Sequence, residues 1–112
     1  MADDIGQVLA ATSGFQWDDG DAPKVVDRHS VEPGECEQVF FQIPLVGSSD
    51  AAHSREEPRW RALGRTIAGR RLLVVFAVRG PLIRVLAARD MNRKERAYTA
   101  ELVPRTKGRP EV

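Results

Sequence analysis

The sequence predicts one small α+β domain with two N-terminal helices, a four-stranded and mainly antiparallel sheet, and a C-terminal helix. Length and composition indicate a single hydrophobic core, because the chain has 112 residues, of which 42% are hydrophobic and 29% charged. Apolar residues recur at helical spacing early in the chain, and short apolar runs separated by turns follow. Collagen-like and wholly disordered chains are therefore excluded.

Two helices are expected before the sheet. The first covers residues 18–29 and follows a short extended piece at 15–17. Asp18 can cap this helix because its carboxylate accepts backbone N–H groups. The second covers residues 33–41, where apolar side chains recur at i, i+3 and i+4.

Four strands are then expected to form an antiparallel meander, with a polar loop between the first and the second. They cover residues 43–46, 59–67, 71–79 and 82–89, and the loop covers 47–58. A two-residue hairpin loop at Gly80 and Pro81 sets the register of the last two strands. It pairs Arg79 with Leu82, Ala77 with Arg84, Phe76 with Val85 and Val74 with Ala87.

This register gives the sheet an apolar face and a mixed face. The apolar face is the expected core and carries Leu72, Val74, Phe76, Val78, Ile83 and Val85. The partly solvated face carries Arg71, Arg79 and Arg84. Alternation places Arg89 on the core side, where it can pair with Asp18 or Glu57.

The end of the chain predicts a last helix and a tail. Asn92 can cap a helix over residues 93–102, and the prolines, glycine and cations after it are typical of a flexible segment. A single domain is thus expected over residues 13–102, between flexible tails at 1–12 and 103–112. Val8–Ala11 can add a helical turn to the first tail.

Three features favour a cytoplasmic protein. The longest apolar run, Leu72–Val78, is too short to cross a bilayer. Asp3 and Asp4 stand where a secretory signal needs a basic region. Cys36 is the single cysteine, so the chain cannot form an internal disulfide.

Charge is separated along the chain. Residues 1–54 carry ten acidic and two basic residues, whereas residues 55–96 carry twelve basic and four acidic ones. Eleven of those twelve cations are arginine, whose planar guanidinium binds phosphate through two hydrogen bonds. The second half is therefore suited to a polyanion. The alternative is a basic surface that pairs internally with the acidic half.

Short motifs along the chain form a pattern that is more specific than any one of them. They are Phe15–Asp18, Lys24, Arg28–Val31, Glu35–Phe41, His53–Ser54, Glu57–Arg59, Gly64–Thr66, Leu73–Phe76 and Ala88–Arg96. In this order and spacing they resemble the BrnT family of type II toxins. The resemblance extends from Phe15 to Tyr98.

The resemblance implies a RelE-like fold and a ribonuclease that suppresses translation. It also implies a BrnA-like antitoxin, a ribbon-helix-helix DNA-binding protein that neutralises the toxin in a heterotetramer and supplies its only contact with DNA. The chain departs from many relatives at Asp21, Val25 and Ser30. An acidic Asp21 near RNA adds repulsion, so either this position lies off the substrate path or activity is reduced.

RNA can be cut without metal when its own 2′-hydroxyl attacks the adjacent phosphorus, which needs a proton acceptor, a proton donor and cations around the phosphate. The acids of the basic half are few and scattered, so a two-metal nuclease site is not expected and no cofactor is needed. Arg65, Arg79 and Arg89 are the expected phosphate clamp, because they lie near the ends of neighbouring strands. His29 and His53 are the expected proton carriers, since only histidine titrates near neutral pH unperturbed.

Further RNA contacts are expected around this clamp. Trp60 can stack on an unpaired base, whereas Trp17 is expected in the core. The other candidates for binding RNA are Arg59, Arg61, Arg84, Lys24 and Arg28. The alternatives are structural: strand-end arginines that keep the sheet soluble, His29 as a helix cap, and His53 as a solvated loop residue.

Two other functions stay open. The same arginines can bind RNA without cutting it, or the chain can be a degenerate toxin that acts only as an antitoxin partner.

Overall fold

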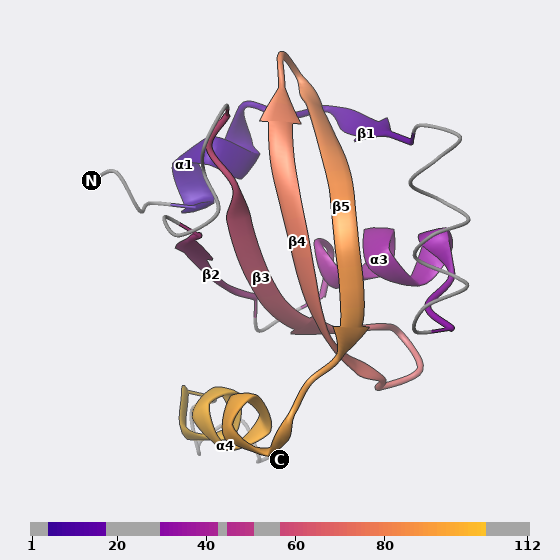
Figure 1. The fold of residues 1–112 in the computed structure, drawn as a ribbon, viewed down its shortest axis with the longest axis vertical. Coiled ribbons are helices and arrows are strands. Elements are labelled where there is room, and N and C mark those ends of the chain that lie inside the picture. Colours follow the sequence, from indigo (N-terminus) through magenta and orange to yellow (C-terminus); the bar gives the residue numbers. More distant parts are fainter. Residues whose placement is uncertain (1–4, 18–29, 43–44, 51–56, 103–112) are drawn as a thin grey trace, which may run out of the picture.

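The computed structural model describes residues 5–17, 30–42, 45–50 and 57–102, and within them it shows a five-stranded sheet with helices around it (Figure 1). In chain order the elements are α1 (Ile5–Ala10), β1 (Gly14–Gln16), α3 (Pro33–Val39), β2 (Val46–Ser49), β3 (Trp60–Arg65), β4 (Arg71–Arg79), β5 (Leu82–Asp90) and α4 (Arg93–Leu102). No helix of the described residues is long and apolar enough to cross a membrane.

The sheet is mixed, with strand order β1-β5-β4-β3-β2. The pairs from β2 to β5 are antiparallel, as the meander predicts, but β1 joins the edge beside β5 in parallel. The prediction of four strands is therefore corrected to five among the described residues. The extended piece around Phe15 belongs to the sheet because it pairs with Ile83 and the loop before it docks through Ser13 N–H on the Pro81 carbonyl at 2.7 Å.

Other boundaries also differ from the predicted ones. Helix α1 forms in a segment predicted to be a flexible tail, and β2 begins at Val46, which was the predicted end of the first strand. Helix α3 begins at the predicted residue and ends two residues early, at Val39. The predicted helix over 18–29 lies outside the described residues.

The hairpin between β4 and β5 contains a bulge that the sequence did not reveal. Arg79, Ala77 and Phe76 pair with Leu82, Arg84 and Val85 as predicted, and Gly80 takes a positive φ of 59° in the turn. Beyond them the register shifts, so that Val75 pairs with Ala87, and Val74 pairs with Ala88 instead of Ala87. Leu86 is therefore an additional residue of β5, and alternation reverses after it.

The core lies between α3 and one face of the sheet. Leu72, Val74, Phe76 and Val85 are fully buried there, together with Cys36 and Val39 of α3. The helix approaches β3 closely at Gly64: a Cβ atom at this position would lie 2.8 Å from Val39 Cγ1. Trp17 packs on this core, as predicted, and its indole N–H donates to Glu37 at 2.8 Å.

Candidate nucleic-acid interface

The face of the sheet opposite α3 carries a row of arginines, which we call the arginine face. Strand pairing places side chains from β3, β4 and β5 on this same side, because directly paired residues share a face and alternate residues return to it. Its cations are Arg61, Arg65, Arg71, Arg79, Arg84 and Arg89. The face is apolar between them, so the guanidinium groups stand beside a surface on which bases can rest.

The bulge decides where Arg89 lies. Regular alternation would put it on the core side, whereas the additional residue Leu86 turns Ala88 inward, to 2% exposure, and Arg89 outward. Pairing with Glu57 is therefore wrong, because Glu57 binds Arg79 at the other end of the sheet, and Asp18 lies outside the described residues. The partner of Arg89 is Glu95 of α4.

At the hairpin end of the sheet, four charged residues form what we call the tip cluster: Glu57, Arg59, Arg79 and Arg84. Arg79 holds Glu57 with two hydrogen bonds, Nη2 to Oε1 at 2.8 Å and Nε to Oε2 at 3.3 Å. The hydrogen bond from Arg79 lowers the pKa of Glu57, and the positive charges of Arg79, Arg84 and Arg59 lower it further. Glu57 is thus a carboxylate in a group of guanidinium ions at neutral pH.

At the opposite end, Arg61, Arg89 and Glu95 form what we call the helix cluster. Arg89 donates to both carboxylate oxygens of Glu95 at 2.8 Å, and Arg61 Nη2 lies 3.5 Å from Oε2. Hydrogen bonding to Arg89 lowers the pKa of Glu95 and raises that of Arg89. Asn92 and Glu95 also cap α4 reciprocally through side chain and backbone at 2.8 and 2.9 Å, so the cluster fixes the start of the helix.

The predicted clamp of Arg65, Arg79 and Arg89 does not form a single pocket. Arg79 pairs with Leu82 beside the hairpin turn, whereas Arg89 pairs with Leu73, six residues earlier on β4. This separation corresponds to about 20 Å along a strand. Arg65 pairs with Arg71 at the Arg89 end. The three arginines share a face but not a site, because the predicted positions near strand ends include opposite ends of the sheet.

The remaining predicted site residues lie in several different places. Trp60 points to the core side and packs against the cluster around Phe76, so it faces away from the arginines. Arg59 and Arg84 join the tip cluster, and Arg61 joins the helix cluster. Lys24, Arg28, His29 and His53 lie outside the described residues.

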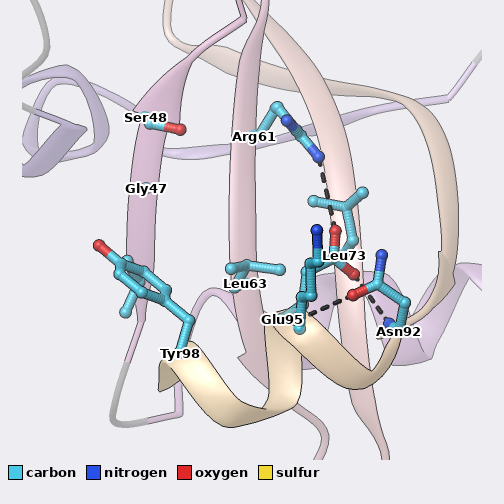
Figure 2. A pocket seen from close by; sticks show the side chains of 10 residues that line it. Gly47, Ser48, Arg61, Leu63, Leu73, Asn92, Glu95 and Tyr98 are labelled. Atoms are coloured by element: carbon cyan, nitrogen blue, oxygen red, sulfur yellow. Dashed lines mark hydrogen bonds and ion pairs between the residues drawn. The ribbon is translucent and has the colours of Figure 1, made fainter. Parts of the chain in front are cut away.

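A pocket opens between α4 and the arginine face (Figure 2), and we call it the α4 pocket. Its volume is about 370 Å³. Leu63 and Leu73 form an apolar floor, while Tyr98 and the pair of Arg61 and Glu95 stand on different sides of it.

Glu57, Glu95 and Tyr98 also lie in these clusters and this pocket, although they were not among the predicted site residues. Glu95 had a usable signal, since Asn92 followed three residues later by Glu is a capping pattern that fixes a carboxylate beside the preceding strand. The described residues contain no group of three or more His, Cys, Asp or Glu side chains that could hold a metal ion.

The described residues thus form a small α+β domain that has its core on one face of a sheet and a row of arginines on the other. The chain belongs to the BrnT family: the family model for the ribonuclease toxin BrnT of type II toxin–antitoxin systems matches residues 17–95.

The fold is similar to that of a solved BrnT structure. The crystal structure of the Brucella abortus ribonuclease toxin BrnT matches with a TM-score of 0.52 and 15% sequence identity, over 73% of this chain and 100% of that chain. No curated protein matches the chain.

Proposed function

We propose that this chain is a metal-independent RNA endonuclease that arrests translation and is neutralised by a BrnA-like ribbon-helix-helix antitoxin. The observation that carries the proposal is the arginine face, where guanidinium groups from three adjacent strands follow one side of the sheet. Arginine binds phosphate in a bidentate manner, and apolar surface between the cations accepts bases. Membership of a ribonuclease toxin family supports RNA as the polyanion.

The tip cluster is the better place for the chemistry. Arg79 and Arg84 lie on neighbouring strands, where Ala77, two residues before Arg79, pairs with Arg84, so both guanidinium groups can contact one phosphate. His53, one of the two expected proton carriers, precedes Glu57 by only four residues in the sequence. The Arg65 and Arg89 end is then a second contact with the RNA backbone.

The proposed reaction is an internal phosphoryl transfer. The 2′-oxygen loses its proton to a base and forms a bond to phosphorus, while the bond from phosphorus to the 5′-oxygen breaks and that oxygen takes up a proton. The products are a 2′,3′-cyclic phosphate and a 5′-hydroxyl. His53 and His29 are the proposed proton carriers, since a base works best when its pKa is near the working pH, and the lowered pKa of Glu57 makes it a weak base. Glu57 positions Arg79.

Cleavage of RNA in the presence of EDTA, with sequencing of the ends, tests this proposal. We expect cyclic or 3′-phosphate ends from the wild type. Arg79→Ala should slow cleavage by about 100-fold, and Arg79→Lys should recover only part of the loss, because lysine cannot make the bidentate contact. His53→Ala and His29→Ala should each slow cleavage without unfolding the protein.

Arg93→Ala is the matched control, because it removes one exposed positive charge from α4 and leaves the sheet unchanged. Full activity in Arg79→Ala and in both histidine variants would contradict the proposed catalytic site. Loss of wild-type cleavage in EDTA would contradict the proposed metal independence.

A second candidate function has one observation in its favour. Arg79 and Arg89 are each held by a carboxylate through two hydrogen bonds, so a phosphate must compete with Glu57 and Glu95 for them. Such a face can bind RNA, or an acidic segment of the antitoxin, without cutting. Tight RNA binding without cleavage would support the non-catalytic alternative. Antitoxin binding without either RNA binding or cleavage would support a degenerate toxin.

A further inference from the structure

The α4 pocket has chemistry that the phosphate contacts do not explain. Its floor is formed by Leu63 and Leu73, and its rim holds Tyr98, whose side chain is 52% exposed although it is a large aromatic group. Ser48, which pairs with Arg61 across β2 and β3, also faces the pocket (Figure 2). Arg61 and Lys94 also line the pocket and can attract a phosphate, but the apolar floor and the exposed ring offer a phosphate no partner.

These groups fit a nucleobase. A flat ring can rest on Tyr98 and the leucine floor, and the Ser48 hydroxyl can donate to or accept from a base edge. The pocket volume of about 370 Å³ lies in the range of small-molecule sites. Arg61 stands at its wall and is held there by Glu95 at 3.5 Å, so a phosphate attached to the base would have a cation beside it.

We infer that the α4 pocket binds one base of the RNA strand, stacked on Tyr98, and that it sets the base preference of the enzyme. This inference rests on the proposed function and deepens it. Arg61 pairs with Val75, four residues before Arg79 on β4, which corresponds to about 13 Å along the strand. The base in the pocket therefore belongs to a nucleotide a short distance from the phosphate that is cut in the tip cluster.

Tyr98 offers a direct readout because the chain has one tyrosine. Protein labelled with ¹³C-tyrosine gives a single set of ring signals, and stacking of a base moves the ring protons upfield. We expect saturable shifts with nucleoside 3′-monophosphates, of different size for different bases. Equal shifts with inorganic phosphate would show that only an anion binds beside Arg61, and would overturn the inference.

Variants test the same pocket in RNA cleavage. Tyr98→Ala should weaken binding of a single-stranded RNA by about 5- to 150-fold, the usual range for loss of one stacked base, and flatten the base preference among cut sites in a random RNA pool. Tyr98→Phe should keep both, because the ring face is retained. Ser48→Ile, which places a strand-forming side chain into the pocket, should act like Tyr98→Ala without removing a contact of α4.

Phe41→Ala is the control, because Phe41 is an aromatic side chain with 75% exposure that contacts Phe15 on the core side of the sheet. Unchanged base preference in both Tyr98→Ala and Ser48→Ile would overturn the pocket and leave the nuclease proposal standing. Nucleotide-dependent shifts of Tyr98 in a wild-type protein that cuts no RNA would support the pocket and refute the proposed function.

Discussion

Glu95 shows how one side chain can serve both the fold and the site. It caps α4 with Asn92 and holds Arg89 and Arg61, with 13% of its side chain exposed. Because these contacts need a carboxylate, hydrogen bonding to Arg89 keeps its pKa below the ordinary 4.5. The stabilisation is therefore present above the pKa of the unfolded chain and is lost as the pH falls through the lower pKa of the folded state.

The first prediction concerns this titration. The free energy of unfolding should decline as the pH is lowered from about 5 toward 3, and Glu95→Gln should remove part of the decline while costing about 1 kcal/mol at pH 7. Urea unfolding followed by circular dichroism over this pH range checks both. The same slope in wild type and variant would show that Glu95 does not couple folding to pH.

The second prediction concerns Cys36. Cys36 lies on α3 and is fully buried in the core. Desolvation of its thiol, with the nearby charges of Glu35 and Glu37, raises its pKa to about 12. Almost no thiolate exists at pH 8, and thiolate is the nucleophile. Iodoacetamide should therefore leave the folded protein unmodified and label it in urea, as measured by mass spectrometry. Rapid labelling without urea would show that α3 opens readily.

At the level of elements, the close approach of α3 to β3 fixes the core side of the sheet. A methyl group at position 64 would meet Val39 Cγ1 at 2.8 Å, so Gly64→Ala must displace the Val39 side chain or the helix that carries it. We expect a cost of about 1–3 kcal/mol, as is usual for overpacking. Thermal unfolding measures this loss of stability, and Val39→Ala is measured beside it for the double-variant test.

The double variant makes this test specific. Val39→Ala alone leaves a cavity, but combined with Gly64→Ala it makes room for the new methyl group, so the double variant should lose less stability than the two single losses together. Strict additivity would show that the two positions do not touch in the folded protein.

The strands differed in how far the sequence could predict them. Strand β4 was predicted with its observed bounds because its apolar run ends at arginines beside turn residues. The bulge at Leu86 was missed, since an additional residue leaves no mark in an apolar strand, and one such residue was enough to reverse the face of Arg89. The extended conformation of β1 was predicted, but its place in the sheet was not, because its parallel pairing with β5 joins residues far apart in the sequence.

At the scale of the whole molecule, the charge pattern predicted a cationic surface, but it did not predict where on that surface each arginine lies. The basic half of the chain does supply the arginine face, but the clamp residues fall at two ends of it. Folding also brings acids to both ends, Glu57 at one and Glu95 at the other. The capping pattern with Asn92 marks Glu95 in the sequence, whereas no local pattern places Glu57 beside Arg79. The alternative of internal pairing with the acidic half is present in part, because Arg70 binds Glu35 at 3.1 Å. Arg79 and Arg89 instead bind carboxylates of the basic half itself.

These carboxylates should control how RNA binding depends on salt. Each phosphate that an arginine neutralises releases counterions, which makes log K fall with log[salt] by about 0.7 per contact for a single strand. Arg71→Ala removes one exposed cation and should reduce this slope by about 0.7. Glu57→Gln should act in the opposite direction, because it removes the carboxylate that competes with RNA for Arg79, and should give tighter binding at low salt and a steeper slope.

Glu101→Gln is the matched control for this last prediction. It raises the net charge by one, as Glu57→Gln does, but at an exposed position near the end of α4 that belongs to neither the tip cluster nor the α4 pocket. Fluorescence anisotropy with a labelled single-stranded RNA between 50 and 300 mM salt, about a sixfold range, gives the slopes. If Glu101→Gln steepens the slope as much as Glu57→Gln, overall charge governs binding. A larger change with Glu57→Gln alone means that RNA replaces Glu57 on Arg79 and that the tip cluster is a contact site.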